Sequence, residues 1–511
     1  MSVTYTNLKA KLYKYNINLV FKPSSKKESI NQQSLMLLAS MINMHIKPNS
    51  KILISLEGYT EGQYISKISR LLRQQNHQIF EYDIAQSVAL TLDEYVMKQN
   101  NIDYLIKISI VGKLNNVQIN LYDANLHHFS SEIIEKIHTN YELNPLLDQS
   151  IAHQNNEYIN LKSYQDELCS NNKILKAFVN IKQRYKSLFY LAHNNFNALE
   201  IAKTLLDNLK NDYRFNNKKS TLFWLKFKAT FLRRLFLRKE IFNLFYFDQN
   251  SQMHVGLNIK NKFKFFSNHE LALLYLDFYF EEYLRAKFDI SKFKVLLPYD
   301  STLLLKNMLK QYNVHYEYFD ENTQNSVLND KSYIFAYDKN KFNGNPKFSS
   351  LLNNYYFFAC LIWMLNSYTN RNNLLAYKYK KVQESFGKIK TNRFQFSVSV
   401  DQSDKLIQFT NQLNRILKSR RIKEIEIINK WNDNNFYLAN IYTHKNTQFS
   451  VFYDFINQKL NISLNFYIVY EHKSVYSLSE HIKNLFLTLK IAKNFKKMCK
   501  IASNKHVSKQ N

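Results

Sequence analysis

The chain has 511 residues, 45% of them hydrophobic, and a formal net charge of +29. This length predicts several domains, and the composition supplies enough apolar residues for several cores. Only 6 residues are glycine, and no P-loop or GxGxxG motif occurs. Nucleotide sites that depend on several glycine-rich phosphate loops are therefore excluded. The 3 cysteines lie far apart, which excludes a disulfide framework or a zinc knuckle.

The basic residues are spread along the whole chain rather than gathered into one stripe. Lys, Asn, Ile, Tyr and Phe are enriched together, whereas Gly, Pro and Ala are scarce. This pattern favours the codon bias of an AT-rich genome over a dedicated nucleic-acid site. The N-terminus lacks the apolar core of a signal peptide, and the longest apolar run, residues 355–365, is too short to span a bilayer. We therefore expect a cytoplasmic protein with no transmembrane segment and no specific nucleic-acid partner.

Strand and helix patterns alternate through residues 51–122, which predicts parallel strands joined by right-handed crossovers. An amphipathic helix over residues 30–46 is expected to cover one face, and Ser131 is expected to cap the helix that follows the last strand. The next unit, residues 160–261, reads as mostly helical before a strand at 241–247. The expected strands of the first region are 51–55, 78–82 and 104–110, and its helices are 63–73 and 92–98.

A capping box, formed by Ser267 and Glu270, predicts the start of a helix over residues 271–284. Further strands are expected at 294–297, 314–319 and 333–337, with a helix beginning near Ser301 and an apolar helix at 355–365. From about residue 394 the pattern changes to that of a small α+β domain with an antiparallel sheet. Its expected helices are 404–418 and 478–490, and its strands are 436–442, 448–452 and 462–470. No internal repeat is visible in the sequence.

A strongly basic segment, residues 225–239 (LKFKATFLRRLFLRK), carries apolar residues at near-helical spacing. Such a helix could lie on an anionic membrane or on a partner. The alternative, which we favour, is a helix that packs on a sheet and leaves its basic face in water.

The stretch from residue 102 to 132 contains a buried strand, a turn and a second strand that ends in YDAN. It resembles the nucleophile region of the phosphohexomutases, the phosphoglucomutase and phosphomannomutase family. The resemblance spans nearly the whole chain in the order and spacing of elements. It implies three α/β domains with mixed sheets around a central cleft, followed by a C-terminal α+β domain. The implied boundaries are 1–150, 151–262, 263–390 and 391–511.

The family's catalytic residues are replaced at the first two matching positions. Val111 stands where the family has its phosphorylated serine, and valine has no oxygen nucleophile. Ser109 is the nearby hydroxyl, which otherwise reads as an ordinary strand residue. The family's metal loop, with three carboxylates, corresponds here to Asp248, Asn250 and Gln252. One carboxylate in place of three should bind Mg²⁺ weakly, so no cofactor is expected although the family resemblance implies Mg²⁺.

The sugar and phosphate loops of the family are also altered. Asp338, Lys339 and Asn340 occupy the place of its paired glutamates, and the lysine reverses one charge. Gln458 and Lys459 occupy the place of its phosphate loop, where no arginine, hydroxyl or glycine remains. Taken alone, these two stretches read as a solvated turn and a surface lysine. A fifth change replaces the N-terminal phosphate-contacting loop by residues 20–23 (VFKP).

Three functions are open at this point. The first is a phosphohexomutase-like protein, related by resemblance to carbohydrate-phosphate metabolism, that has lost catalysis; its partners would be a weakly bound sugar phosphate or another protein. The second is an active hexose-phosphate mutase, an intramolecular phosphotransferase, with a rewired site near Ser109. The third is a non-catalytic binder of a protein or of an anionic surface. Turnover, or a phosphoprotein intermediate, would separate the second from the first.

Overall fold

The structure is a computed structural model of the whole chain. It describes residues 9–15, 17–22, 30–57, 63–83, 87–111, 116–145, 157–170, 188–231, 242–249, 251–259, 262–298, 300–318, 330, 332–338, 341–344, 354–371, 375–397, 422–427, 436–443, 447–454, 459–468 and isolated residues between 482 and 494.

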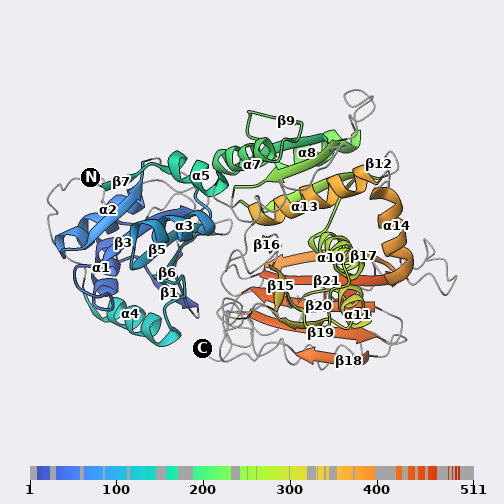
Figure 1. Cartoon of the computed structure of the whole chain (residues 1–511). Helices are drawn as coiled ribbons and strands as arrows, with labels where there is room; N and C mark the ends of the chain where they lie inside the picture. The colour runs from blue at the N-terminus through green and yellow to red at the C-terminus, as the bar shows by residue number, and fades with distance from the viewer. Residues whose placement is uncertain are drawn as a thin grey trace. The chain divides into compact units, whose positions relative to one another are not determined.

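The first sheet has seven strands in the order β1-β2-β6-β5-β3-β4-β7 (Figure 1). Its centre is parallel, because β3 pairs in parallel with both β4 and β5, and β6 then returns antiparallel to β5. The elements of this region are β1 (Leu12–Tyr15), β2 (Asn18–Phe21), α1 (Gln32–Asn43), β3 (Lys51–Glu57), α2 (Gln63–Gln74), β4 (Gln78–Tyr82), α3 (Leu90–Asn100), β5 (Tyr104–Val111), β6 (Asn116–Asp123), α4 (Ser131–Leu143), β7 (Glu157–Ile159) and α5 (Leu161–Ser170).

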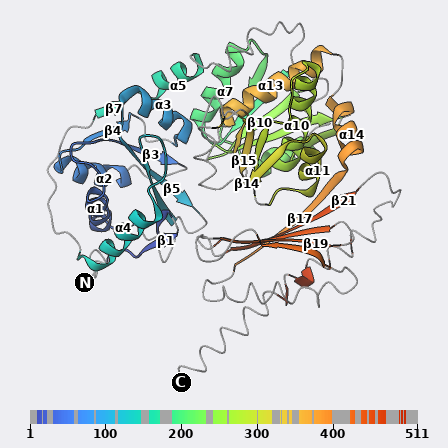
Figure 2. The ribbon, with the colours of Figure 1, turned by 60° about the horizontal axis from the view of Figure 1, so that its bottom comes forward.

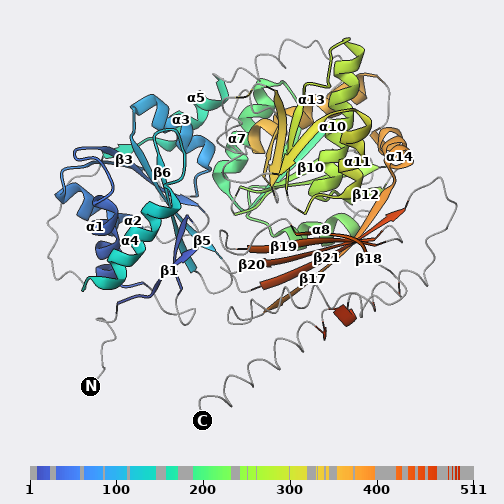
Figure 3. The same ribbon diagram turned by 90° about the horizontal axis from the view of Figure 1, so that it is seen from below.

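Alternate side chains of the first sheet enter two separate apolar layers. Ile52 and Ile54 of β3 join one core with α1, α2 and α4, whereas Leu53 joins another with α3 and α5. Figure 3 shows α1, α2 and α4 on one side of these strands and α3 on the other. Because successive strand residues point to opposite faces and both faces are covered, the middle of β3 is mostly apolar, with the buried Ser55 as its polar exception.

The second sheet has five strands in the order β12-β11-β10-β8-β9. β8 pairs in parallel with β9 and β10, and β11 returns antiparallel to β10. Its elements are β8 (Leu188–His193), α7 (Phe196–Asn208), β9 (Tyr213–Phe215), α8 (Leu222–Phe231), β10 (Phe242–Phe247), β11 (Met253–Ile259) and β12 (Lys262–Phe265).

The third sheet has four strands in the order β14-β13-β15-β16. β13 pairs in parallel with β15, and β16 returns antiparallel to β15. The elements of this region are α10 (Asn268–Arg285), β13 (Lys294–Leu297), α11 (Leu303–Gln311), β14 (His315–Tyr318), β15 (Tyr333–Asp338), β16 (Lys341–Asn343), α13 (Asn354–Asn370) and α14 (Leu375–Phe386).

These three sheets share one topology. Each sheet contains four consecutive strands with the same arrangement. The first of the four lies between the second and the third, and the fourth forms a hairpin with the third. The orders are β4-β3-β5-β6, β9-β8-β10-β11 and β14-β13-β15-β16. The chain therefore repeats one structural unit three times, although no repeat is visible in its sequence. Sheet topology depends on the apolar pattern and on strand order, and both tolerate almost any residue identity.

The fourth sheet is antiparallel throughout, in the order β17-β21-β20-β19-β18. Figure 2 shows its strands side by side in one layer. They are β17 (Lys388–Ser397), β18 (Ile422–Ile427), β19 (Phe436–Thr443), β20 (Thr447–Asp454) and β21 (Lys459–Ile468). The expected change to an antiparallel sheet near residue 394 is confirmed.

The chain forms two compact units. The first unit contains residues 1–271, 292–297 and 317–377, and the second contains residues 272–291, 298–316 and 378–511. Four sheets agree in number with the four expected domains, but β7 extends the first sheet past residue 150 and β17 crosses residue 390. The domain boundaries therefore stay a prediction.

Most expected elements are confirmed as mixed α/β structure, including the capping box. The Ser267 N–H donates to Glu270, and the Glu270 N–H donates to the Ser267 hydroxyl at 3.3 Å. Two expectations were wrong: β8 and β9 interrupt the segment read as mostly helical, and Ser130 rather than Ser131 caps α4. The helix α14 was not among the expected elements. The helix expected at 404–418 lies wholly outside the described residues, and the helix expected at 478–490 lies largely outside them.

Among the helices that the structure describes, none has both the length and the apolar composition needed to cross a membrane.

The half-buried histidine His128 should make stability depend on pH. Burial beside Tyr122, whose ring centroid lies 4.2 Å from that of His128, lowers the pKa of His128 from 6.5 to about 4. The unfolded chain therefore takes up a proton here at a higher pH than the folded chain, so stability is full above pH 6.5 and falls as pH drops toward 4. Between pH 7 and pH 5, we expect His128→Phe to lose about 2 kcal/mol less stability than the parent protein.

Urea unfolding at pH 7 and pH 5, for both forms of the protein, measures this effect. The pKa values of His45, His77 and His193 are also lowered by burial, so the variant should keep some acid sensitivity. An unchanged pH dependence in His128→Phe would contradict the assignment.

Candidate functional site

The four positions that correspond to the family's loops all lie at turns between antiparallel strands. Each turn connects the two strands of a hairpin, and the closing pairs are Val111 with Asn116, Phe247 with Met253, Asp338 with Lys341, and Asp454 with Lys459. The first three turns belong to the first unit, and the fourth belongs to the second unit. The repeated topology thus places one turn at the end of each hairpin.

At the first position, Val111 is the last residue of β5, and the following residues 112–115 lie outside the described ones. Ser109 lies inside the sheet, where it pairs with Glu57 of β3 and Gln118 of β6. Its exposed fraction is 6%. A nucleophile has to reach its substrate, so a hydroxyl held between two strands is poorly placed to replace the family's serine.

At the second position, the Asp248 carboxylate holds its own turn. One carboxylate oxygen accepts the Gln252 backbone N–H at 2.8 Å, and the other lies 3.3 Å from Nε2 of His254. The turn closes through the Asp248 N–H and the Gln252 carbonyl, and Ser251 takes a left-handed conformation with φ of 57°. Asn250 lies outside the described residues. Asp248 therefore acts as the polar residue of a turn.

This donor set does not fit Mg²⁺. The ion prefers an octahedral shell of oxygens, supplied by carboxylates and water. Both oxygens of Asp248 instead face an N–H group and an imidazole of its own hairpin. In the part of the chain that the structure describes, no group of three or more His, Cys, Asp or Glu side chains could hold a metal ion.

Buried asparagines join the second position to the third. Asn195, at the start of α7, donates to the Ser251 hydroxyl at 3.0 Å. Asn354, at the start of α13, donates to the Ser251 carbonyl at 2.8 Å and accepts the Phe342 N–H of β16 at 2.9 Å. The side chain of Asn354 thus links the β10–β11 turn to the β15–β16 hairpin. Sequence reasoning missed this contact; the one signal was a polar residue directly before the apolar run of α13.

At the third position, the hydroxyl of Tyr337 is hydrogen-bonded to Nδ1 of His269 at 2.8 Å. Both residues are buried, and the Tyr337 ring stacks on Phe342 with 5.6 Å between centroids. Asp338 ends β15 and pairs with Lys341, while Lys339 and Asn340 lie outside the described residues. Tyr337, which directly precedes Asp338, therefore belongs to the core.

At the fourth position, Lys459 is the first residue of β21 and pairs with Asp454 and with Ser397. Gln458 lies outside the described residues.

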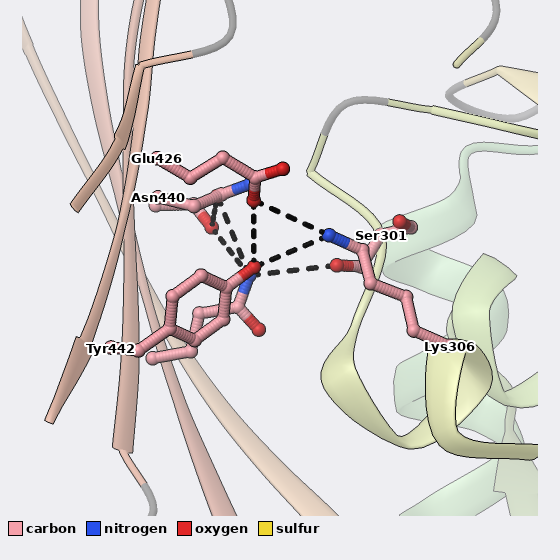
Figure 4. Close-up of polar contacts among 7 residues, drawn as sticks. Ser301, Lys306, Glu426, Asn440 and Tyr442 are labelled. Atoms are coloured by element: carbon pink, nitrogen blue, oxygen red, sulfur yellow. Dashed lines mark hydrogen bonds and ion pairs between the residues drawn. The ribbon is translucent and has the colours of Figure 1, made fainter. Parts of the chain in front are cut away.

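A buried lysine joins α11 to the fourth sheet within the second unit. Nζ of Lys306 lies 3.2 Å from the Tyr442 hydroxyl and 3.5 Å from the Glu426 carboxylate, and Tyr442 donates to the same carboxylate at 3.0 Å. Figure 4 shows Lys306 extending from its helix toward these strands. Burial lowers the pKa of Lys306, although the charge of Glu426 opposes the shift. Because Lys306 has an ionic partner and a phenolic partner, we assign it to packing.

Comparison with solved structures identifies the fold. A protein of Thermus thermophilus, assigned provisionally as a phosphomannomutase, is 12% identical with a TM-score of 0.62, over 89% of this chain and 95% of the other. A phosphoglucomutase/phosphomannomutase family protein of Burkholderia thailandensis is 8% identical with a TM-score of 0.62, over 96% and 97%. Parafusin, a phosphoglucomutase of Paramecium in its open form, is 10% identical with a TM-score of 0.61, over 94% and 98%.

At these identities the likeness shows the fold alone, and the fold is that of the phosphohexomutases. No protein-family model matches the sequence, and the search of curated proteins found no match to it. The fold expected from the order of elements is confirmed, and what the loop positions do is a separate question.

Proposed function

We propose that the chain is a phosphohexomutase-like protein that no longer interconverts hexose 1- and 6-phosphates. The proposal rests chiefly on Asp248, whose carboxylate is turned to its own hairpin by the Gln252 N–H and His254. Phosphoryl transfer to a sugar hydroxyl depends on electrostatic stabilisation by metal and positioned cations, which a single engaged carboxylate does not supply.

The nucleophile position gives independent support. Valine at position 111 cannot form a phosphoryl ester, and Ser109 is buried within the sheet. Loss of a covalent nucleophile alone typically costs about 10⁴-fold or more in rate. The division into four domains at residues 150, 262 and 390 is part of the same proposal, with the main part of one sheet in each domain.

A coupled assay tests the proposal. Purified protein is given glucose 1-phosphate or mannose 1-phosphate with Mg²⁺ and the bisphosphate activator, and an active phosphohexomutase serves as the positive control. We expect no turnover by this chain. Turnover that disappears in Ser109→Ala would instead support a mutase with a rewired site.

Thermal unfolding with the same sugar phosphates separates two forms of the proposal. Stabilisation without turnover would indicate that sugar phosphate is still bound. If the melting temperature is unchanged and no turnover occurs, the fold serves a partner other than a sugar phosphate.

A further inference from the structure

The helix α8 exposes large aromatic side chains at its first turns. The exposed fractions are 78% for Phe223, 49% for Trp224 and 39% for Phe227. The rings of Trp224 and Phe227 stack on each other, with 5.3 Å between centroids. Side chains of this size are usually covered in a folded protein, so together they mark a surface for binding.

The opposite side of α8 fixes these aromatics in place. Leu225 is buried against Ala192 and Tyr246 of the second sheet. The Tyr246 hydroxyl donates to the Ser220 carbonyl at 2.9 Å, and the Ser220 N–H donates to the His193 carbonyl at 2.8 Å. Figure 1 shows α8 beside β12. Within the described part of the basic segment 225–239, Leu225 therefore packs on the sheet as expected. The aromatic face of α8 points outward.

The segment that carries this face is basic, although the exposed Asp212 lies directly before it. Residues 213–231 contain five basic side chains and no Asp or Glu. Lys218, Lys219 and Lys226 are exposed. Glu270 follows β12 in the chain, but it is paired with Lys264. We call the set Lys218, Lys219, Phe223, Trp224, Lys226 and Phe227 the α8 surface.

We propose that the α8 surface binds the surface of a membrane that contains anionic lipids. Tryptophan and phenylalanine favour the boundary between headgroups and acyl chains, and lysines beside them are attracted to anionic headgroups. A protein partner would be expected to meet at least one acidic side chain in this stretch, since protein interfaces usually combine both charges. The proposal is independent of whether the chain catalyses phosphoryl transfer.

Sedimentation of the full chain with lipid vesicles tests the proposal. We expect binding to phosphatidylcholine vesicles that contain phosphatidylserine at physiological ionic strength, and little binding to pure phosphatidylcholine. The double variants Phe223→Ser/Trp224→Ser and Lys218→Glu/Lys219→Glu should each weaken binding by about tenfold or more. Because all four side chains are exposed, the melting temperature should stay near that of the parent.

Matched variants elsewhere control for bulk charge and hydrophobicity. Leu284 and Phe288 have exposed fractions of 48% and 61%, and Lys287 and Lys292 beside them are also exposed. Two control variants replace the same kinds of side chain elsewhere: Leu284→Ser/Phe288→Ser removes two large apolar side chains, and Lys287→Glu/Lys292→Glu reverses two positive charges. Both should leave vesicle binding unchanged. Equal loss in these controls would show that the net charge of +29 alone drives adhesion, which overturns the proposal.

Brominated lipids locate the contact. The chain has 3 tryptophans, so Trp224→Phe should keep vesicle binding and lose most of the fluorescence quenching. Quenching that persists would place another tryptophan at the lipid and overturn the assignment.

Absence of vesicle binding, with a change of oligomeric state in Phe223→Ser/Trp224→Ser, would make the α8 surface an interface between copies of the chain and would likewise overturn it.

Discussion

Replacement of Lys107 by methionine should lower the free energy of unfolding of the first unit by about 3–5 kcal/mol. Lys107 lies in β5 with side-chain exposure of 1%, and its ion-pair partner Asp93 of α3 has 0%. The ammonium also donates to the Ser55 hydroxyl at 3.2 Å and to the Val88 carbonyl at 2.8 Å. Methionine fills much of the same volume but leaves the carboxylate buried without a cation, with only the Tyr82 and Ser55 hydroxyls as side-chain donors.

Urea unfolding, with amide hydrogen exchange in β5 and α3 to localise the effect, measures this loss. Burial raises the pKa of Asp93, and the charge of Lys107 offsets part of that shift. Without Lys107 the carboxyl should take up a proton more readily, so the loss should shrink as pH falls.

Lys98→Met is the matched control, because it makes the same substitution in α3, the helix that carries Asp93. Lys98 is 66% exposed and pairs with Glu94 at 2.6 Å, so its loss should change stability by about 0.5 kcal/mol or less.

Replacing both partners, as in Lys107→Met/Asp93→Leu, should recover part of the stability. A loss below about 1 kcal/mol in Lys107→Met would show that the pair contributes little.

Replacement of Lys378 by methionine should destabilise the second unit by a similar amount, about 3–5 kcal/mol. Lys378 of α14 forms ion pairs with Asp277 and, at 2.7 Å, with Glu281, both on α10. The Tyr312 hydroxyl donates to the same Asp277 at 2.7 Å. Burial acts to raise the pKa of Glu281, but the hydrogen bond and charge of Lys378 outweigh it, so the pKa lies below its usual value.

The effect should appear as faster amide exchange in α10 and α14 and as a lower urea midpoint. Lys380→Met is the control on the same helix, since Lys380 is 59% exposed and pairs with Glu384 at 3.1 Å. It should leave both readouts nearly unchanged. Equal effects of the two substitutions would mean that helix propensity, rather than the buried cluster, explains the loss.

These buried lysines show where sequence reasoning reaches its limit. Apolar patterning was enough to predict β3, β4 and β5, because a strand covered on both faces is rich in apolar residues even where it holds single buried polar ones. The same reading gave no sign that any lysine is buried. Lys107 and Lys378 are buried because carboxylates from other elements meet them, and a pattern along one element carries no information about such partners.

The missed strands have a related cause. β9 spans three residues, too few for an alternating pattern, and β8 (LFYLAH) is an apolar run that also suits a helix. At the candidate site, the sequence predicted that β5, β10 and β15 end near the loop positions, and the assignment of those positions stays a prediction. It could not show that Asp248 bonds its own turn or that Asn354 bridges two hairpins, because both depend on side-chain direction within turns.

The repeated hairpins make the chain suited to transplantation of loops. The paired ladders of the three hairpins end at Val111 with Asn116, Phe247 with Met253 and Asp338 with Lys341, so a connecting segment of matching length would leave the strand register unchanged. Catalytic loops from an active relative could therefore be grafted one at a time. The β10–β11 graft would have to keep Ser251, whose contacts with Asn195 and Asn354 anchor that turn. A fold assembled in this way can accept new connecting segments without any change in its sheets.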